Sequence, residues 1–156
     1  MSVKAIPEGY CGVTPYLSIS GAAEAIEFYK RAFNADELFR MAAPSGNIMH
    51  AEIKIGDSPI MLADSCKETG FQDPKNLSGT SVGLHIYVEN VDELFSQAVG
   101  SGAKIIKPVE DQFYGDRNGT LEDPFGHFWF ISTHKEDLSP EEIAERAKEL
   151  FAQGNA

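Results

Sequence analysis

The hydrophobic pattern of this chain occurs twice. A short apolar run at Leu17 is followed by an amphipathic segment, and a similar run at Ile86, 69 positions later, is followed by another. In each half, alternation with a period of two predicts a strand, the helical period of the next segment predicts a helix, and three further alternating runs predict three strands. The sequence therefore predicts two βαβββ modules, and paired modules of this kind leave a cleft in which a ligand can bind.

The predicted boundaries follow from this alternation and from turn residues. Module one, about 12–66, is expected to contain a strand at 12–20, a helix at 21–33 and strands at 35–42, 48–55 and 58–64. A polar segment at 67–79, rich in Gly, Pro and Asn, is the expected linker. Module two, about 80–134, is expected to contain a strand at 81–89, a helix at 91–102 and strands at 103–109, 114–122 and 127–133. Both modules are expected to lie in one domain that spans 1–156.

A further helix is predicted near the C-terminus, at about 139–153. Ser139 is followed by Pro140 and Glu142, the pattern of a capping box with proline in the first helical position. The residues from Ile143 to Phe151 carry an apolar stripe at helical spacing. We expect this stripe to dock on the body of the protein or on a second subunit.

Composition restricts the class of partner. With 156 residues and 42% hydrophobic content, the chain can fold around one core without disulfides or metals. A net charge of −11 argues against nucleic acid or an anionic membrane as partner. Cys11 and Cys66 fit neither a disulfide framework nor a zinc site, which indicates reduced thiols in a cytoplasmic protein. We find no signal peptide and no apolar run long enough to span a membrane.

Several short runs have the sequence of a known family. Three of them are Ala25–Tyr29, Val88–Val91 and the turn Leu121–His127. They resemble the vicinal oxygen chelate superfamily, which includes glyoxalase I, extradiol dioxygenases and the bleomycin and fosfomycin resistance proteins. Four more are similar to its PhnB-like branch: Met49–Glu52, Ile60–Asp64, Tyr114–Arg117 and Thr133–Asp137.

This resemblance implies an α+β fold. Its two tandem βαβββ modules form a curved sheet that lines a cleft, with helices on the outer face and the extra helix at the C-terminus. The resemblance also implies a homodimer, in which strand exchange between subunits is one possible arrangement.

The resemblance also places the metal-ligand positions of the superfamily. They fall at Thr14, Met61, Gly83 and Phe130. Catalytic divalent metals in such sites need imidazole and carboxylate donors, which these four side chains lack. We therefore expect no metal at the usual site and no cofactor.

A displaced site is the alternative. Strand alternation places His50 and Glu52 on the side of their strand that faces the cleft, and it places His85 on the corresponding side of another strand. These three residues would bind one divalent metal, or the two histidines would act as acid and base. They are otherwise polar residues of a wet cleft, or they bind the substrate.

Aromatic and apolar side chains complete the predicted cleft. Such a lining suits a small, partly apolar ligand, and it equally suits a dry core between the modules. Arg117 follows an aromatic loop and is either a clamp for an anionic ligand or the partner of Asp116, Asp123 or Glu122. The candidate substrate-binding residues are Tyr16, His50, Glu52, Met61, His85, Tyr87, Phe113, Arg117, Phe128 and Phe130.

Three functional hypotheses follow, and no residue is assigned a catalytic role. The first, which we favour, is a metal-independent binder of a small, partly apolar molecule in the cleft between the modules. The second is a metal-dependent or histidine-based lyase or isomerase of the glyoxalase type. The third is a protein-interaction module that uses the C-terminal helix. The sequence contains no glycine-rich loop for S-adenosylmethionine, no phosphate-binding loop and no Gly-x-Ser-x-Gly nucleophile turn.

Overall fold

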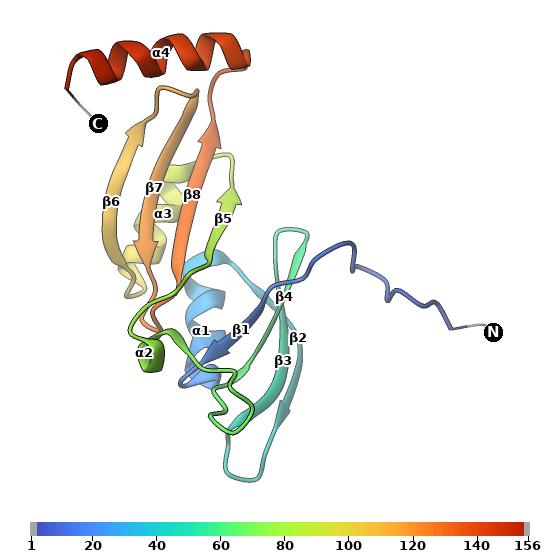
Figure 1. The fold of residues 1–156 in the computed structure, drawn as a ribbon. Helices are drawn as coiled ribbons and strands as arrows, with labels where there is room; N and C mark the ends of the chain where they lie inside the picture. The colour runs from blue at the N-terminus through green and yellow to red at the C-terminus, as the bar shows by residue number, and fades with distance from the viewer. Residues whose placement is uncertain (1–2, 155–156) are drawn as a thin grey trace.

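A computed structural model describes residues 3–154, which form two βαβββ modules (Figure 1). Module one contains β1 (Tyr16–Ile19), α1 (Ala22–Phe33), β2 (Asp36–Ala42), β3 (Ile48–Ile55) and β4 (Ser58–Asp64). Module two contains β5 (Gly83–Tyr87), α3 (Val91–Gly100), β6 (Lys104–Asp111), β7 (Asp116–Glu122) and β8 (Phe128–His134). A short helix, α2 (Pro74–Leu77), lies in the linker, and α4 (Pro140–Ala152) follows module two. The predicted α+β fold and its order of elements are confirmed.

The two sheets have the same topology. Their strand orders are β1-β4-β3-β2 and β5-β8-β7-β6, with one parallel pair in each, β1 with β4 and β5 with β8. Tyr16 lies opposite Met61, and His85 lies opposite Phe130, so the sequence repeat is also a repeat in strand register. Within the described residues, no strand pairing joins the two sheets, and β1 and β5 are both edge strands.

Alternation along the strands separates the two faces of each sheet. In β3, Ile53 and Ile55 are buried, whereas His50 and Glu52 lie on the other face and are partly exposed. The carboxylate of Asp64, at the end of β4, accepts hydrogen bonds from the N–H groups of Gly21 and Ala22 and so caps α1. Each module therefore covers one sheet face with a helix and leaves the other face open.

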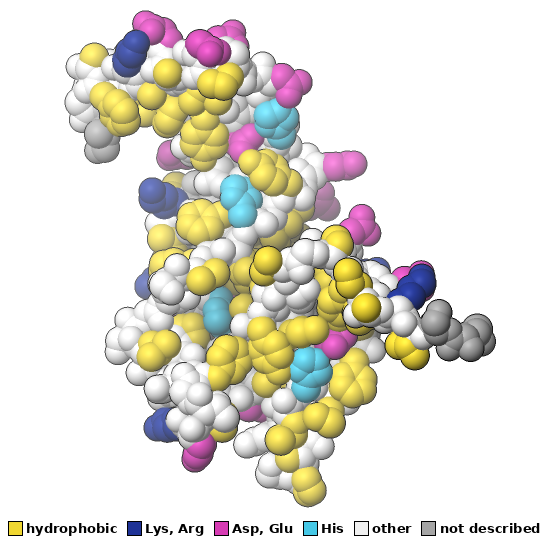
Figure 2. Space-filling model, turned by 45° about the vertical axis from the view of Figure 1, so that its right-hand side comes forward, with side chains coloured by type: hydrophobic (Ala, Val, Ile, Leu, Met, Phe, Trp, Pro, Cys, Tyr) yellow, Lys and Arg dark blue, Asp and Glu magenta, His cyan; other side chains and the backbone are white. Residues whose placement is uncertain are grey.

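The helices of the two modules pack against each other. Helix α1 contacts α3, and Phe33 of α1 packs on Trp129 of β8 with ring centroids 4.4 Å apart. Tyr29 of α1 donates a hydrogen bond of 2.7 Å to Asp123, which lies in the turn before β8. One hydrophobic core therefore runs through both modules. The open sheet faces remain at the surface, and Figure 2 shows hydrophobic and histidine side chains interspersed on one side of the molecule.

Helix α4 lies across the end of the second sheet, far from the first module (Figure 1). Its capping box is present as predicted, because Ser139 and Glu142 each accept a hydrogen bond from the backbone of the other. Arg146 ties the helix to Glu136 and to the carbonyl of Phe113. No residue of α4 is buried, so its apolar stripe is only half covered by the body.

None of the helices in 3–154 is long and apolar enough to cross a membrane.

Apart from small differences at the ends of elements such as β5, α3, β6 and β7, two local features differ from the expectation. The first strand was predicted from position 12, but it begins at Tyr16, where pairing with β4 begins. The predicted linker contains α2, whose start is marked in the sequence by an N-cap and a proline. Asp73 is fully buried and accepts hydrogen bonds from the backbone N–H groups of Lys75 and Asn76.

Candidate functional site

The open face of module one carries a row of side chains that crosses all four strands. Tyr16 on β1 lies opposite Met61 on β4, Met61 lies opposite Glu52 on β3, and Glu52 lies opposite Phe39 on β2. Because side chains at paired positions of a sheet share a face, these four lie side by side. Three of them were predicted site residues, and Phe39 is an addition that only the register reveals.

Hydrogen bonds link this row to its neighbours. His50 contacts the hydroxyl of Tyr16 through Nδ1 at 2.8 Å and the carboxylate of Glu52 through Nε2 at 3.1 Å. The hydroxyl of Tyr10 donates to the other oxygen of Glu52. Tyr10 lies in the irregular segment before β1, and no periodic pattern in that segment predicts its position.

These contacts determine the protonation of the network. The hydrogen bond from Tyr10, followed by that from His50, lowers the pKa of Glu52 below its usual value. Burial, followed by the hydrogen bond to Glu52, raises the pKa of Tyr10 to about 12. Burial, followed by the charge of Glu52, also raises the pKa of Tyr16. At neutral pH the network therefore consists of an ionised carboxylate and two neutral phenols.

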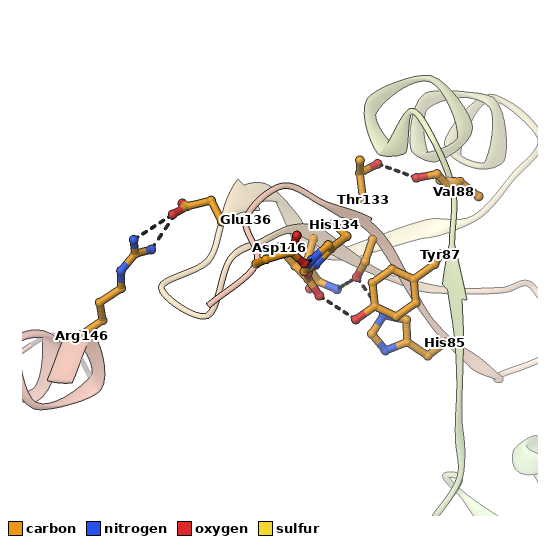
Figure 3. Close-up of polar contacts among 11 residues, drawn as sticks. His85, Tyr87, Val88, Asp116, Thr133, His134, Glu136 and Arg146 are labelled. Atoms are coloured by element: carbon orange, nitrogen blue, oxygen red, sulfur yellow. Dashed lines mark hydrogen bonds and ion pairs between the residues drawn. The ribbon is translucent and has the colours of Figure 1, made fainter. Parts of the chain in front are cut away.

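The open face of module two has its own polar network (Figure 3). His85 Nε2 lies 2.8 Å from the hydroxyl of Ser132, which also accepts a hydrogen bond of 2.7 Å from Asn118. The imidazole of His85 stacks on the ring of Tyr87, with centroids 4.8 Å apart and an interplanar angle of 14°. Phe130 lies on the other side of His85, at 6.2 Å between centroids.

A second carboxylate anchors this face. Asp116 is 5% exposed, accepts a hydrogen bond of 2.7 Å from Tyr87 and lies 2.9 Å from His134 Nδ1 (Figure 3). The other nitrogen of His134 lies 2.9 Å from Asp137. Burial alone would raise the pKa of Asp116, but the hydrogen bonds from Tyr87 and His134 outweigh burial and lower it. The hydrogen bonds to Asp116 and Asp137 raise the pKa of His134.

Four members of this network were not among the residues predicted from the sequence: Asp116, Asn118, Ser132 and His134. Their signal was present in the alternation of β7 and β8, which places Asp116, Asn118 and Ser132 on the same face as His85. Only the strand register shows that these side chains are neighbours.

The usual metal positions hold no suitable donors. A side chain at Gly83 would overlap the ring of Phe130, which shows that this ring lies directly over the backbone of β5. Two of the four positions are thus packed against each other as glycine and benzyl ring, and Met61 offers only a thioether. The residues present do not fit a divalent metal there.

The displaced metal site is also not assembled within one chain. His50 and Glu52 are neighbours, but His85 lies on the other sheet and contacts Ser132. Among residues 3–154, no three His, Cys, Asp or Glu side chains are grouped closely enough to hold a metal ion.

Two pockets adjoin the open faces. One, of about 780 Å³, lies between the segment before β1, the turn between β3 and β4, and strand β5, and His85 and Tyr87 are in its wall. The other, of about 410 Å³, lies between β1 and the linker, and its wall includes Tyr16, Phe71 and His127. Both volumes suit a small ligand.

The remaining candidates lie elsewhere. Arg117 is on the α3 side of β7, where it donates to both oxygens of Asp92 and to Asp111, and not to the carboxylates named as its possible partners. Its hydrogen bonds to these two carboxylates raise its pKa. Phe113 lies in the loop beside α4, and Phe128 lies opposite Gly83. Eight of the ten predicted residues are therefore divided between the two open faces, Arg117 lies on the helix-covered side of the second sheet and Phe113 lies in a loop, so one chain does not gather them into one pocket.

Comparison with known proteins agrees with this fold. The family model of the Glyoxalase/Bleomycin resistance protein/Dioxygenase superfamily matches residues 14–131. The uncharacterized protein Mb0911c of Mycobacterium bovis is 37% identical over 134 residues, which cover 84% of this chain and 88% of the relative.

Two solved structures have the same fold at low sequence identity. The PhnB protein from Bacillus cereus superposes with a TM-score of 0.63 at 19% identity, over 79% of this chain and 99% of that one. The fosfomycin resistance protein FosX from Listeria monocytogenes superposes with a TM-score of 0.61 at 16% identity, over 86% of this chain and 98% of that one. The repeated βαβββ topology, the family match and these neighbours agree, and the chain belongs to the Glyoxalase/Bleomycin resistance protein/Dioxygenase superfamily.

Proposed function

We propose that this protein binds a small, partly apolar molecule without a metal, in a cleft between an open face of module one and an open face of module two. The observation that carries the proposal is the make-up of these faces. Each combines aromatic rings with one hydrogen-bonded carboxylate, Glu52 or Asp116, and among residues 3–154 neither offers a set of metal donors. Apolar walls with a few fixed polar groups are typical of sites for small ligands.

We further propose that two copies of the chain complete this cleft. Large apolar side chains stay at the surface of both open faces, including Phe39 at 49% exposure and Tyr87 at 60%. Strands β1 and β5 also have unpaired edges, which proteins normally cover. A homodimer in which module one of one copy faces module two of the other would cover both. The free thiols of Cys11 and Cys66 are consistent with the cytoplasm as the compartment.

Ligand binding is tested with a thermal-shift screen of small apolar and aromatic compounds on the purified full-length protein. We expect the hits to lose affinity at least tenfold in Tyr16→Ala and Phe130→Ala, both of which should keep the circular dichroism spectrum of the parent. Phe151→Ala is the matched control, because Phe151 is an exposed aromatic residue of α4, which lies across the end of the second sheet. Unchanged affinity in both face variants would refute the proposed cleft.

Complementation tests the shared cleft. When Tyr16→Ala and Phe130→Ala chains are co-expressed in equal amounts, a mixed dimer of the proposed kind has one cleft with both changes and one with neither. Roughly a quarter of all clefts would then bind ligand with the parent affinity, by statistical pairing of two chains in a symmetric dimer. If each chain formed its own cleft, every cleft would carry one change and no site of parent affinity would appear.

Metal independence has a separate measurement. We expect no stoichiometric metal in protein purified without chelator or affinity-tag metal, and no stabilisation that is specific to zinc, nickel, manganese or iron(II). A thermal shift from one ion that His50→Ala or His85→Ala removes would instead support the displaced metal site.

One observation favours a second candidate, a histidine-based lyase or isomerase. His50 pairs with Glu52 and His134 pairs with Asp116, an arrangement that orients an imidazole for proton transfer. Turnover of an oxygenated small substrate that His50→Ala lowers at least a hundredfold, with binding retained, would establish this activity. Binding without turnover in a broad substrate panel would leave the binder as the function.

A further inference from the structure

Aromatic rings follow one another along the open face of module one. Phe71 packs on Tyr16 at 5.3 Å between centroids, Tyr16 packs on His50 at 5.4 Å, and His50 lies 6.2 Å from Phe39. The carboxylate of Glu52 lies in the middle of this face, between Met61 and Phe39 in the cross-strand row. A ligand on this face would therefore meet ring surfaces and one carboxylate.

The hydrogen bonds to the carboxylate of Glu52 can all be formed by neutral partners. A neutral imidazole has one N–H and one acceptor nitrogen. If Nε2 of His50 donates to Glu52, Nδ1 accepts from the hydroxyl of Tyr16, and every contact is satisfied without a charge on the ring. Tyr10 contributes a neutral phenol, since its pKa is about 12. With the ring in this neutral tautomer, the four side chains carry one net negative charge, that of Glu52.

Among the described residues, no lysine or arginine side chain forms an ion pair with Glu52. On the described part of module one, Lys30 and Arg40 form ion pairs with Glu27 and Glu37 beside α1, away from the open face. Lys54 shares the face, two residues beyond Glu52 along β3 and opposite Pro59, and forms no ion pair with Glu52. The side chain of Glu52 is 24% exposed, so a ligand atom can reach it.

We propose that the ligand of this face is a planar aromatic cation, with its positive charge at the carboxylate of Glu52 and its ring against Tyr16 and its aromatic neighbours. This inference rests on the proposed binding function and specifies its ligand class. Ring faces attract cations through their quadrupole, and the attraction adds to that of a nearby carboxylate in a partly desolvated site. The net charge of −11 favours the approach of a cation. The pocket of about 410 Å³ shares Tyr16 and Phe71 with the face and offers room for the rest of a larger ligand.

A matched pair of probes tests the charge alone. N-methylquinolinium is a permanent cation, and quinoline has the same ring system and is neutral at pH 7.5. By isothermal titration of the full-length protein, we expect the cation to bind at least tenfold more tightly. Added salt should weaken binding of the cation and leave binding of quinoline nearly unchanged.

Two variants assign the preference to Glu52. Glu52→Gln keeps an acceptor for Tyr10 and removes the charge, so it should bring the two affinities within about twofold of each other. Glu141→Gln, in the first turn of α4, removes one charge far from the face and should preserve the tenfold preference. Equal or tighter binding of quinoline, or a preference that survives Glu52→Gln, would overturn the proposal.

Failure of this inference is distinguishable from failure of the proposed function. If neither probe binds but the compound screen yields ligands that Tyr16→Ala weakens, the cation preference is wrong and the binding function stands. If neither the probes nor the screen yields a ligand, both proposals fall.

Discussion

The contact between Tyr29 and Asp123 joins the two modules, and its removal should destabilise the whole domain. Asp123 is 3% exposed, and its carboxylate accepts four hydrogen bonds. Two come from the backbone N–H groups of Phe125 and His127, at 2.9 and 3.0 Å. The other two come from the side chains of Tyr29, at 2.7 Å, and Trp129, at 2.8 Å. One carboxylate therefore organises the turn before β8 and ties it to α1.

Removing Tyr29 from this contact and removing Asp123 from it should lower the free energy of unfolding by different amounts. Tyr29→Phe removes one hydrogen bond to a charged group and leaves no donor unsatisfied, so we expect a loss of about 1.5–3 kcal/mol in the free energy of unfolding. Asp123→Ala leaves four buried donors without an acceptor and should cost more, roughly 3–5 kcal/mol. For a domain of this size the loss in Tyr29→Phe corresponds to a decrease of roughly 3–12 °C in Tm.

Urea unfolding of the single and double variants measures these values. Because Tyr29 and Asp123 contact each other directly, their costs should not add, and the coupling free energy should be about 1.5–3 kcal/mol. Tyr114→Phe is the control, because the hydroxyl of Tyr114 has no hydrogen bond within the described residues, and it should stay within about 0.5 kcal/mol of the parent. A Tyr29→Phe variant as stable as this control, or fully additive costs, would refute the reasoning.

Two further predictions concern module two. Gly83→Ala should destabilise the protein by about 1–3 kcal/mol in urea unfolding, because the added carbon overlaps the ring of Phe130, and Phe130→Ala in the same chain should relieve part of that cost. A Gly83→Ala variant of parent stability would show that the ring moves aside freely. The pKa of His134 is raised above the unfolded value of about 6.5, so its contribution to stability is complete below pH 6.5 and is lost as the pH rises through the folded pKa. Amide exchange in the segment between β8 and α4 should then accelerate more than intrinsic exchange, and His134→Asn should remove this excess; an equal pH response in both proteins would contradict the role of His134.

Much of the fold was predictable because its determinants are local. Strands β3 and β4 begin and end at the predicted residues, since the turns at 44–47 and 56–57, each with a glycine, mark the start of β3 and the junction between the two strands. Helix α4 was recognisable from its capping box. The start of β1 was not predictable from alternation, because it depends on where pairing with β4 begins. Helix α2 carried a readable signal in Asp73 and Pro74, but its one turn is too short to show a hydrophobic period.

The sequence predicted which sheet face a candidate site residue lies on, but not which other residues it contacts. Alternation placed His50 and Glu52 on one face of β3, and the structure joins them through a hydrogen bond. Alternation gives no information on what approaches from a segment without period, which is how Tyr10 reaches Glu52. It also could not show that His134 and Asp116 meet, because their contact depends on the register between β7 and β8.

The relation between the two open faces lies outside what any periodic pattern can determine. Alternation with a period of two predicts which side chains share a face of one sheet, and an apolar stripe predicts which side of a helix is buried. Neither pattern predicts which other surface a given sheet face will pack against. The shared core of α1, α3 and β8 uses the helix-covered faces to join the modules, which leaves both ring-bearing faces at the surface. Surfaces of that composition are rarely left uncovered. The cleft predicted from the repeat is therefore best sought between copies of the chain, where Glu52 of one copy would face the aromatic side chains of another.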